Sequence, residues 1–255
     1  MTAIVSVTTS VDDLNESDRS ACFRLISEQF LGVRRDDFER DFAEKEAVLL
    51  LRDRSEDGPI VGFSTIVTLP FSVAGRRVRA IFSGDTVVDP RYRFSSGALK
   101  VLGSYFVHTL ARFPGEAVYY VLISKGWRTY KMLSSLFRHF TPSPRESAES
   151  DRAIIDAFGV MKYPRSFDPD AGLIRAGDDA PRLRPDGVDA VATRVDERVA
   201  FFLRSNPRYL DGDELVCAGR VAPENFAAPL QRALAQSGGD RDDDRLAVVG
   251  ALLGR

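Results

Sequence analysis

The 255-residue sequence has few of the side chains on which several kinds of protein depend. It has two cysteines, Cys22 and Cys217, in no CxxC or CxxH pair, and two histidines, His108 and His139. A disulfide framework, a metal site and a histidine-based triad are therefore not expected. No apolar run approaches the ~20 residues of a membrane span, and no amino-terminal segment combines a basic start with a long apolar run. The composition predicts a soluble cytoplasmic protein with no membrane span.

An excess of charge of one sign is also missing. The chain has 35 Lys and Arg against 37 Asp and Glu, a formal net charge of −2. This balance disfavours nucleic acid, or an anionic membrane, as a partner recruited by bulk charge. Only five of the basic residues are lysine and thirty are arginine. The planar guanidinium suits phosphate and carboxylate groups, although a GC-rich genome would produce the same bias.

Hydrophobic spacing predicts a mixed α/β (α+β) fold in which helices flank a mostly antiparallel central sheet. The expected order is strand, two helices, three strands, loop, helix, strand and helix. Ser17 or Asp18 is the expected N-cap of the first helix. The predicted strands are 5–9, 47–52, 60–69, 77–88 and 118–123, and the predicted helices are 18–30, 36–46, 99–110 and 126–137.

The pattern is less regular after residue 140, where six prolines interrupt the segment 141–187. This region either completes the first sheet or forms a small second lobe, and we expect the former. The turn at 211–214 can also place carboxylates at the mouth of a binding site. The predicted elements are short strands at 172–175 and 214–221 and helices at 196–204 and 225–236, followed by an acidic patch at 238–244.

A polar loop at 91–97 leads directly into the predicted helix 99–110. The first N–H groups of a helix have no partner within the helix and carry partial positive charge, so such a loop can bind phosphate. Arg91 and Arg93 would add charge-assisted hydrogen bonds. The alternative is an ordinary helix with a serine cap and two solvated arginines. The amides available to a phosphate are those of Ser95, Ser96, Gly97, Ala98 and Leu99.

The predicted strand 77–88 contains a charged residue beside a glycine, Gly84-Asp85. A charge in an otherwise apolar strand is unfavourable unless it is paired or used, and the glycine favours a β-bulge. Asp85 is therefore the candidate general base for taking a proton from an amine. The alternative is a structural Asp85 that caps the bulge or pairs with an arginine.

The element order and the loop motif resemble the GCN5-related N-acetyltransferase (GNAT) superfamily. In that family the loop after the fourth strand follows a Q/R-x-x-G-x-G/A pattern and binds the pyrophosphate of coenzyme A. Arg93 and Ala98 match the two ends of this pattern, and Ser96 stands at its usual first glycine. Residues 87–93 (VVDPRYR) are similar to the V-x-P-x-x-R approach to the loop.

The resemblance continues in the next strand and helix. Residues 121–124 (VLIS) look like the family's fifth strand, and Tyr130 opens a Y-x-x-L pattern on the following helix. The resemblance covers residues 3–140 well and 141–221 by element order only. It implies a GNAT-like acyltransferase domain over 1–221 and a C-terminal helical extension with an acidic patch over 222–255.

The resemblance implies transfer of an acyl group from a thioester to the amine of a small molecule. The donor would be acetyl-CoA, a longer acyl-CoA, or the acyl-phosphopantetheine of a carrier protein, as in N-acyl amino acid synthases. Asp85 would be the base, and Tyr130 the acid that protonates the departing thiolate; a structural aromatic is the alternative for Tyr130. The donor would be bound by Val87, Val88, Arg91, Arg93, Ser95, Ser96, Gly97, Ala98, Leu99 and Ser124.

A second hypothesis is a non-catalytic module that kept the fold and uses its cleft to bind a metabolite or a protein partner. The irregular region after residue 140 is compatible with it. A nucleic-acid-binding protein is disfavoured because the chain has no basic stripe with interleaved aromatic residues. The oligomeric state stays open, and a homodimer is one of the options.

Overall fold

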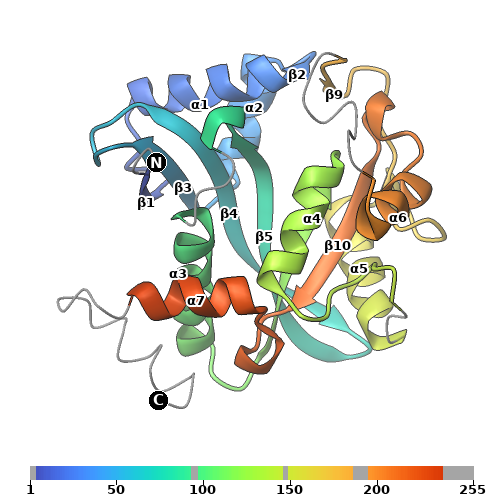
Figure 1. The fold of residues 1–255 in the computed structure, drawn as a ribbon. Coiled ribbons are helices and arrows are strands. Elements are labelled where there is room, and N and C mark those ends of the chain that lie inside the picture. Colours follow the sequence, from blue (N-terminus) through green and yellow to red (C-terminus); the bar gives the residue numbers. More distant parts are fainter. Residues whose placement is uncertain (1–3, 93–96, 146–148, 186–194, 238–255) are drawn as a thin grey trace.

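The computed structural model describes residues 4–92, 97–145, 149–185 and 195–237. Its strands are β1 (Ile4–Ser10), β2 (Phe30–Leu31), β3 (Ala47–Asp53), β4 (Ile60–Val73), β5 (Arg76–Val88), β6 (Ala117–Ser124), β7 (Phe167–Asp168), β8 (Leu173–Ile174), β9 (Arg182–Leu183) and β10 (Glu214–Arg220). Eight of them form one sheet in the order β1-β3-β4-β5-β6-β10-β8-β7, and β2 pairs with β9 (Figure 1). The pairing of β5 with β6 is parallel, and every other pairing between these strands is antiparallel.

Helices cover both faces of the sheet. The α-helices are α1 (Glu16–Gln29), α2 (Arg35–Ala43), α3 (Gly97–Arg112), α4 (Trp127–Leu136), α5 (Glu149–Lys162), α6 (Glu197–Ser205) and α7 (Ala228–Ser237), and short 3₁₀ turns occupy Pro90–Tyr92, Tyr209–Asp211 and Pro223–Asn225. Neighbouring residues of a strand point to opposite faces. Ile81 therefore packs into the core with Phe106 of α3 and Leu133 of α4, whereas Phe82 packs with Phe158 of α5.

The prediction of a mixed α/β fold with a mostly antiparallel sheet is confirmed. Every element expected before residue 137 is present, with its ends shifted by at most a few residues. The expected N-cap of α1 is wrong: Asn15 caps this helix, because its Oδ1 accepts a hydrogen bond from the amide of Asp18 at 2.8 Å. Asp18 itself lies in the first helical turn, where a negative charge is favourable.

The region after residue 140 completes the first sheet, as expected. β10 pairs antiparallel with β6 from Leu215–Ser124 to Arg220–Tyr119. α5 lies between Pro144 and Pro164, where no helix was predicted, and buries Ile154, Ile155 and Phe158. α7 packs on α3, and the acidic patch at 238–244 lies outside the described residues.

The state of the two cysteines and the character of the helices can be read directly from the structure. Cys22 and Cys217 are both free and buried. Among the helices of the described residues, none has the length and apolar character needed to cross a membrane.

Gly219 of β10 allows a phenylalanine to pack directly on the sheet. A Cβ at this position would lie 2.5 Å from the ring of Phe137, which is 1% exposed and stacks on Phe106 with a centroid distance of 5.7 Å. We therefore expect Gly219→Ala to lower the free energy of unfolding by about 1–3 kcal/mol, since overpacking displaces the ring. Gly177→Ala is the matched control, because no atom lies within 4 Å of its Cβ position. Urea unfolding measures both, and equal stability of the two variants would contradict this packing.

Candidate active site

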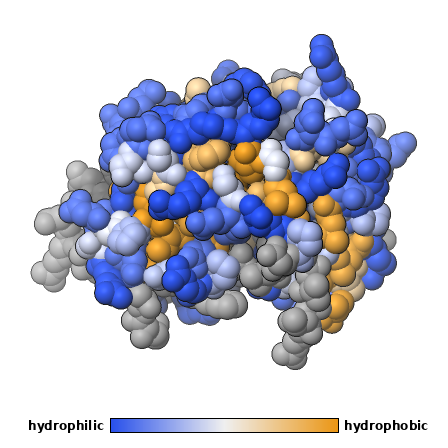
Figure 2. All heavy atoms as spheres, turned by 90° about the horizontal axis from the view of Figure 1, so that it is seen from above, coloured by the Kyte–Doolittle hydropathy of each residue, from blue (hydrophilic) through white to orange (hydrophobic). Residues whose placement is uncertain are grey.

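A cavity of about 300 Å³ opens where β5 and β6 separate. The two strands are paired from Val78–Ala117 to Ser83–Leu122, and both continue beyond the last pair. The ends of α1, α2 and β9 complete the walls of the cavity, which we call the cleft. Figure 2 shows the molecule from above this end, with apolar side chains along the middle of the face and polar side chains around them.

The β-bulge predicted at Gly84-Asp85 is present at the floor of the cleft. Ser64 pairs with Thr86 and Ile66 with Ser83, so Gly84 and Asp85 together face the single residue between Ser64 and Ile66. A bulge of this kind redirects a side chain out of the regular alternation of the strand.

Glycine is required at this bulge because of what lies against it. A Cβ on Gly84 would be 2.8 Å from both Thr65 Oγ1 and Lys45 Cε. Lys45 thereby reaches the floor of the cleft with a side chain that is 0% exposed. Nothing in the sequence indicated this burial, because Lys45 falls within the predicted helix 36–46 and helical spacing does not show what packs against it.

Asp85 is half-buried, and its carboxylate makes no hydrogen bond or ion pair with any other described residue. Burial raises the pKa of Asp85 to about 6; the charge of Asp41 adds to the increase, and those of Lys125 and Lys45 oppose it. A carboxylate with this pKa is mostly ionised at neutral pH and is still a useful base. The alternative, in which Asp85 pairs with an arginine, is not found among the described residues.

The two lysines near Asp85 have carboxylate partners of their own. Lys45 Nζ lies 2.6 Å from Asp41 Oδ2 and donates to the Asp41 carbonyl oxygen at 2.9 Å. Lys125 Nζ lies 3.5 Å from Glu214 Oε1. Asp41, Lys125 and Glu214 all line the cleft. The sequence had suggested that the turn at 211–214 places a carboxylate at a binding site, and Glu214 is that carboxylate.

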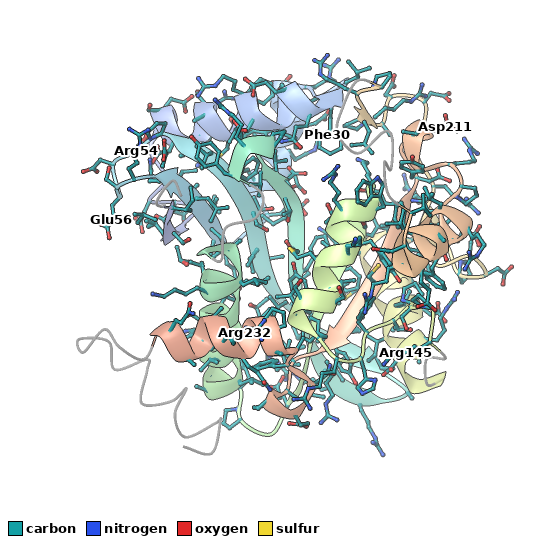
Figure 3. All side chains as sticks on the ribbon, viewed as in Figure 1. Phe30, Arg54, Glu56, Arg145, Asp211 and Arg232 are labelled. Atoms are coloured by element: carbon teal, nitrogen blue, oxygen red, sulfur yellow. The ribbon has the colours of Figure 1, made fainter. Side chains whose placement is uncertain are left out.

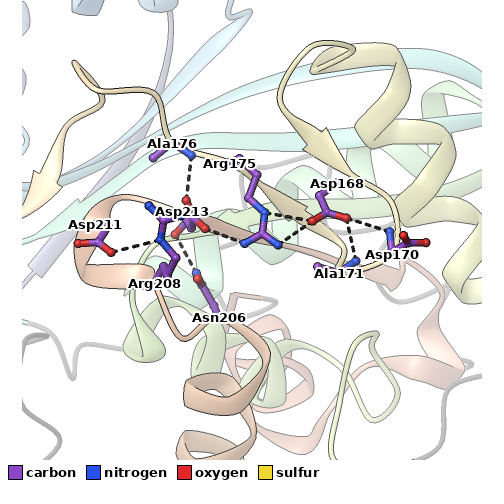
Figure 4. Close-up of polar contacts among 9 residues, drawn as sticks. All are labelled: Asp168, Asp170, Ala171, Arg175, Ala176, Asn206, Arg208, Asp211 and Asp213. Carbon is purple, nitrogen blue, oxygen red and sulfur yellow. Dashed lines mark hydrogen bonds and ion pairs between the residues drawn. The ribbon is translucent and has the colours of Figure 1, made fainter.

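A buried polar network holds the chain just before Glu214 (Figure 4). Asp213 is 1% exposed; its side chain accepts hydrogen bonds from the amide of Ala176 at 2.9 Å and from Arg175 Nη1 at 2.8 Å. Asn206 Nδ2 donates to the Asp213 carbonyl oxygen at 2.8 Å. Arg175 also binds Asp168 through Nε and Nη2. These bonds fix the start of β10 and so the position of Glu214.

The structure does not bring Tyr130 and Asp85 together. Tyr130 is 0% exposed, its hydroxyl donates to the Pro142 carbonyl oxygen at 3.0 Å, and its ring stacks on Phe201. It is not among the residues that line the cleft. Spacing alone placed Tyr130 on one face of α4, and that face turns toward α6.

Tyr163, which follows α5, is a tyrosine of the cleft that sequence reasoning missed. Its hydroxyl makes no hydrogen bond with another described residue. Burial raises the pKa of Tyr163, and the carboxylates of Glu214, Asp41 and Asp85 raise it further. Tyr163 therefore stays protonated and can donate a hydrogen bond into the cleft.

The residues expected to bind donor phosphates are described only in part. Arg93, Ser95 and Ser96 lie outside the described residues. Arg91 has a side chain that is 78% exposed, and its guanidinium binds Asp89 through two nitrogens, at 2.6 and 3.1 Å. This partner offsets part of the positive charge that Arg91 would offer to a phosphate.

The first residues of α3 pack closely on β1. Gly97 begins the helix, and a Cβ there would lie 2.5 Å from Ser6 Oγ. This Oγ is buried and has no hydrogen-bond partner. Ala98 and Leu99 follow in the first turn and are half-buried. The first amides of a helix have no partner within the helix, so the start of α3 is compatible with a phosphate group of a thioester donor.

The remaining residues predicted for the donor lie at the ends of β5 and β6. Val87 lines the cleft. The carbonyl oxygen of Val88 accepts a hydrogen bond from Gln29 Nε2 at 3.1 Å. Ser124 is fully buried and donates to the Gly126 carbonyl oxygen at 2.7 Å, which uses its hydroxyl at the start of α4. In the part of the chain that the structure describes, no three His, Cys, Asp or Glu side chains form a cluster that could hold a metal ion.

Comparison with known proteins finds similar solved structures only. No family model and no curated protein matches the chain. A conserved protein of Enterococcus faecalis named a probable N-acyltransferase is 14% identical with a TM-score of 0.38, over 52% of this chain and 33% of that chain. A GCN5-related N-acetyltransferase of Kribbella flavida is 16% identical with a TM-score of 0.39, over 55% of this chain and 34% of that one. A GNAT family N-acetyltransferase of Escherichia coli in complex with CoA is 19% identical with a TM-score of 0.33, over 48% of this chain and 64% of that one.

The chain therefore spans about a third of the length of the first two of these structures. They belong to the kind of protein that the sequence resembles. The function proposed below rests on the sequence motifs and the geometry of the cleft.

The raised pKa of Asp85 makes a prediction about stability. An unfolded chain ionises this carboxyl near its ordinary pKa of 3.8 and the folded chain near 6, so the folded state binds more protons between these values and loses stability as the pH rises through them. We expect Asp85→Asn to match the wild type near pH 4 and to exceed its free energy of unfolding by up to about 3 kcal/mol above pH 6. Urea unfolding from pH 4 to 8 measures the difference; a variant less stable than wild type at pH 7 would contradict the burial of an unpaired charge.

Proposed function

We propose that the chain is an N-acyltransferase that moves an acyl group from an acyl thioester to the amine of a small molecule. The observation that carries the proposal is the unpaired carboxylate of Asp85, held by a bulge at the point where β5 and β6 separate. A carboxylate with a pKa of about 6 in a cleft is suited to accept a proton from an ammonium group. The motif resemblance at 87–98 supports a thioester donor.

The proposed reaction uses two side chains of the cleft. The ammonium group of the acceptor gives one proton to Asp85, and the neutral nitrogen attacks the carbonyl carbon of the thioester. The C–N bond forms, the C–S bond breaks, and the second proton of the nitrogen ends on the sulfur, which leaves an amide and a thiol. Tyr163, a hydrogen-bond donor in the same cleft, would stabilise the departing sulfur.

The proposed donor is acetyl-CoA, a longer acyl-CoA or the acyl-phosphopantetheine of a carrier protein. Its phosphates would lie at the start of α3. Apolar side chains such as Phe82 and Ile123 line the cleft and suit an acyl chain longer than acetyl. The residues proposed for the donor are Val87, Val88, Arg91, Arg93, Ser95, Ser96, Gly97, Ala98, Leu99 and Ser124.

A second candidate function is a non-catalytic binding protein with the same fold. Two observations favour it: Tyr130 is withdrawn from the cleft, and Asp89 binds the guanidinium of Arg91. Thermal shift with acetyl-, octanoyl- and palmitoyl-CoA, followed by thiol release with a panel of amines, separates the two functions. Stabilisation by a donor without thiol release for any amine would favour the binding protein.

We expect Asp85→Asn to lower the rate of amine-dependent thiol release by about 100-fold or more, because general base catalysis contributes this much. In the wild type, kcat/KM should fall tenfold per pH unit below about pH 6, where Asp85 becomes protonated. Asp37→Asn is the matched control: Asp37 lines the same cleft but pairs with Arg34 and Arg40. Equal rates for Asp85→Asn and Asp37→Asn would remove Asp85 from the mechanism.

The two tyrosines can be distinguished by matched variants. We expect Tyr163→Phe to lower kcat by about tenfold or more, since it removes a hydrogen-bond donor from the cleft. Tyr130→Phe removes the bond to the Pro142 carbonyl and should lower the free energy of unfolding by about 1 kcal/mol with little change in kcat. Thiol release and urea unfolding of both variants provide the measurement. A large fall in kcat for Tyr130→Phe, with little change for Tyr163→Phe, would show that Tyr130 is the acid, as the sequence motif predicts.

A further inference from the structure

Every charged side chain that lines the cleft has at least one partner of opposite charge, with one exception; Asp37 at the outer edge has two partners, Arg34 and Arg40. Arg34 Nε lies 3.6 Å from Asp37 Oδ2 at the outer edge, where both side chains are exposed. The next two pairs lie deeper: Lys45 binds Asp41 and Lys125 binds Glu214, at 2.6 and 3.5 Å. The exception is Asp85, which has no such partner among the described residues.

Asp85 is therefore the one carboxylate among the described lining residues that has no cationic partner. A ligand with one positive charge and no negative charge neutralises it. A zwitterionic ligand would bring a carboxylate close to Asp85 and Glu214, where no described cation is free to bind it. Juxtaposed like charges disfavour binding, and breaking an existing ion pair to accommodate the new carboxylate is also unfavourable.

Apolar side chains make up much of the rest of the cleft lining. Ile26 of α1, Phe30 at the C-terminal end of that helix (Figure 3), Phe38 of α2 and Leu183 of β9 are among them. Apolar walls with one placed charged group select a ligand that has an apolar body and one polar head.

We infer that the acyl acceptor is a monocationic amine on an apolar body without a carboxylate, an arylalkyl- or alkylamine and not an amino acid. The inference rests on the proposed function, because it names the acceptor of the same cleft. It differs from the amino acid acceptors that the sequence resemblance left open, and the difference comes from the absence of an unpaired cation among the described residues of the cleft.

The test compares phenethylamine with phenylalanine, which differ only in the α-carboxylate. Isothermal titration calorimetry at pH 7.5 on the whole chain, without a donor, should give phenethylamine an affinity at least about tenfold higher, and ethylamine, which lacks the ring, should bind at least about tenfold more weakly than phenethylamine. Asp85→Asn should abolish phenethylamine binding while Asp37→Asn retains it. Phenylalanine binding as tightly as phenethylamine, or no binding of phenethylamine, would overturn the inference.

A second readout separates this inference from the proposed function. Thiol release is measured with octanoyl-CoA and each of the three amines. Faster release with phenylalanine than with phenethylamine would overturn the inference and leave an acyltransferase. Selective binding of phenethylamine without thiol release, for short and long acyl-CoA or an acyl-carrier protein, would overturn the proposed function, while the charge selectivity of the cleft would stand.

Discussion

The candidate site depends on the separation of two parallel strands. While β5 and β6 are hydrogen-bonded, as far as Ser83 and Leu122, their side chains belong to the core on both faces. Beyond that pair the bulge at Gly84-Asp85 turns a carboxylate into the opening instead of toward a partner. Neighbouring elements then supply what surrounds it: Lys45 from the end of α2, Lys125 from the turn after β6, and Glu214 from the start of β10. Without the separation there would be neither a cavity nor an unpaired charge.

The sequence could predict this bulge because two local signals agree. A glycine and an aspartate interrupt a strand of apolar residues, and both are unfavourable there unless the strand is irregular. The turn at 211–214 gave a similar local signal, and Glu214 does reach the cleft. Fold class and strand order were predictable for the same reason, since alternating and helical spacing are properties of short segments.

The remaining features depend on tertiary packing, which short-range patterns do not contain. Tyr130 has the right motif spacing, but the spacing does not say that its face of α4 packs against Phe201 of α6. Tyr163 follows α5, a helix that the surrounding prolines made difficult to predict. It reaches the cleft because α5 packs on β4 and β10. Lys45 falls within the predicted helix 36–46, and its burial depends on the close approach that Gly84 permits, which the helical spacing does not show.

The pairing of β2 with β9 has a consequence for how the cleft forms. Its two strands are two residues long, and Arg184 beside them donates to the Ser27 carbonyl oxygen, 157 positions earlier in the chain. The long loop between the two strands must close before their contacts can form. The pairing of β2 with β9 is therefore a late event in folding. On the ribosome, helix α1 emerges long before the segment that covers its end. The carboxylate of Asp85 therefore stays in an incomplete cleft until most of the chain has been synthesised.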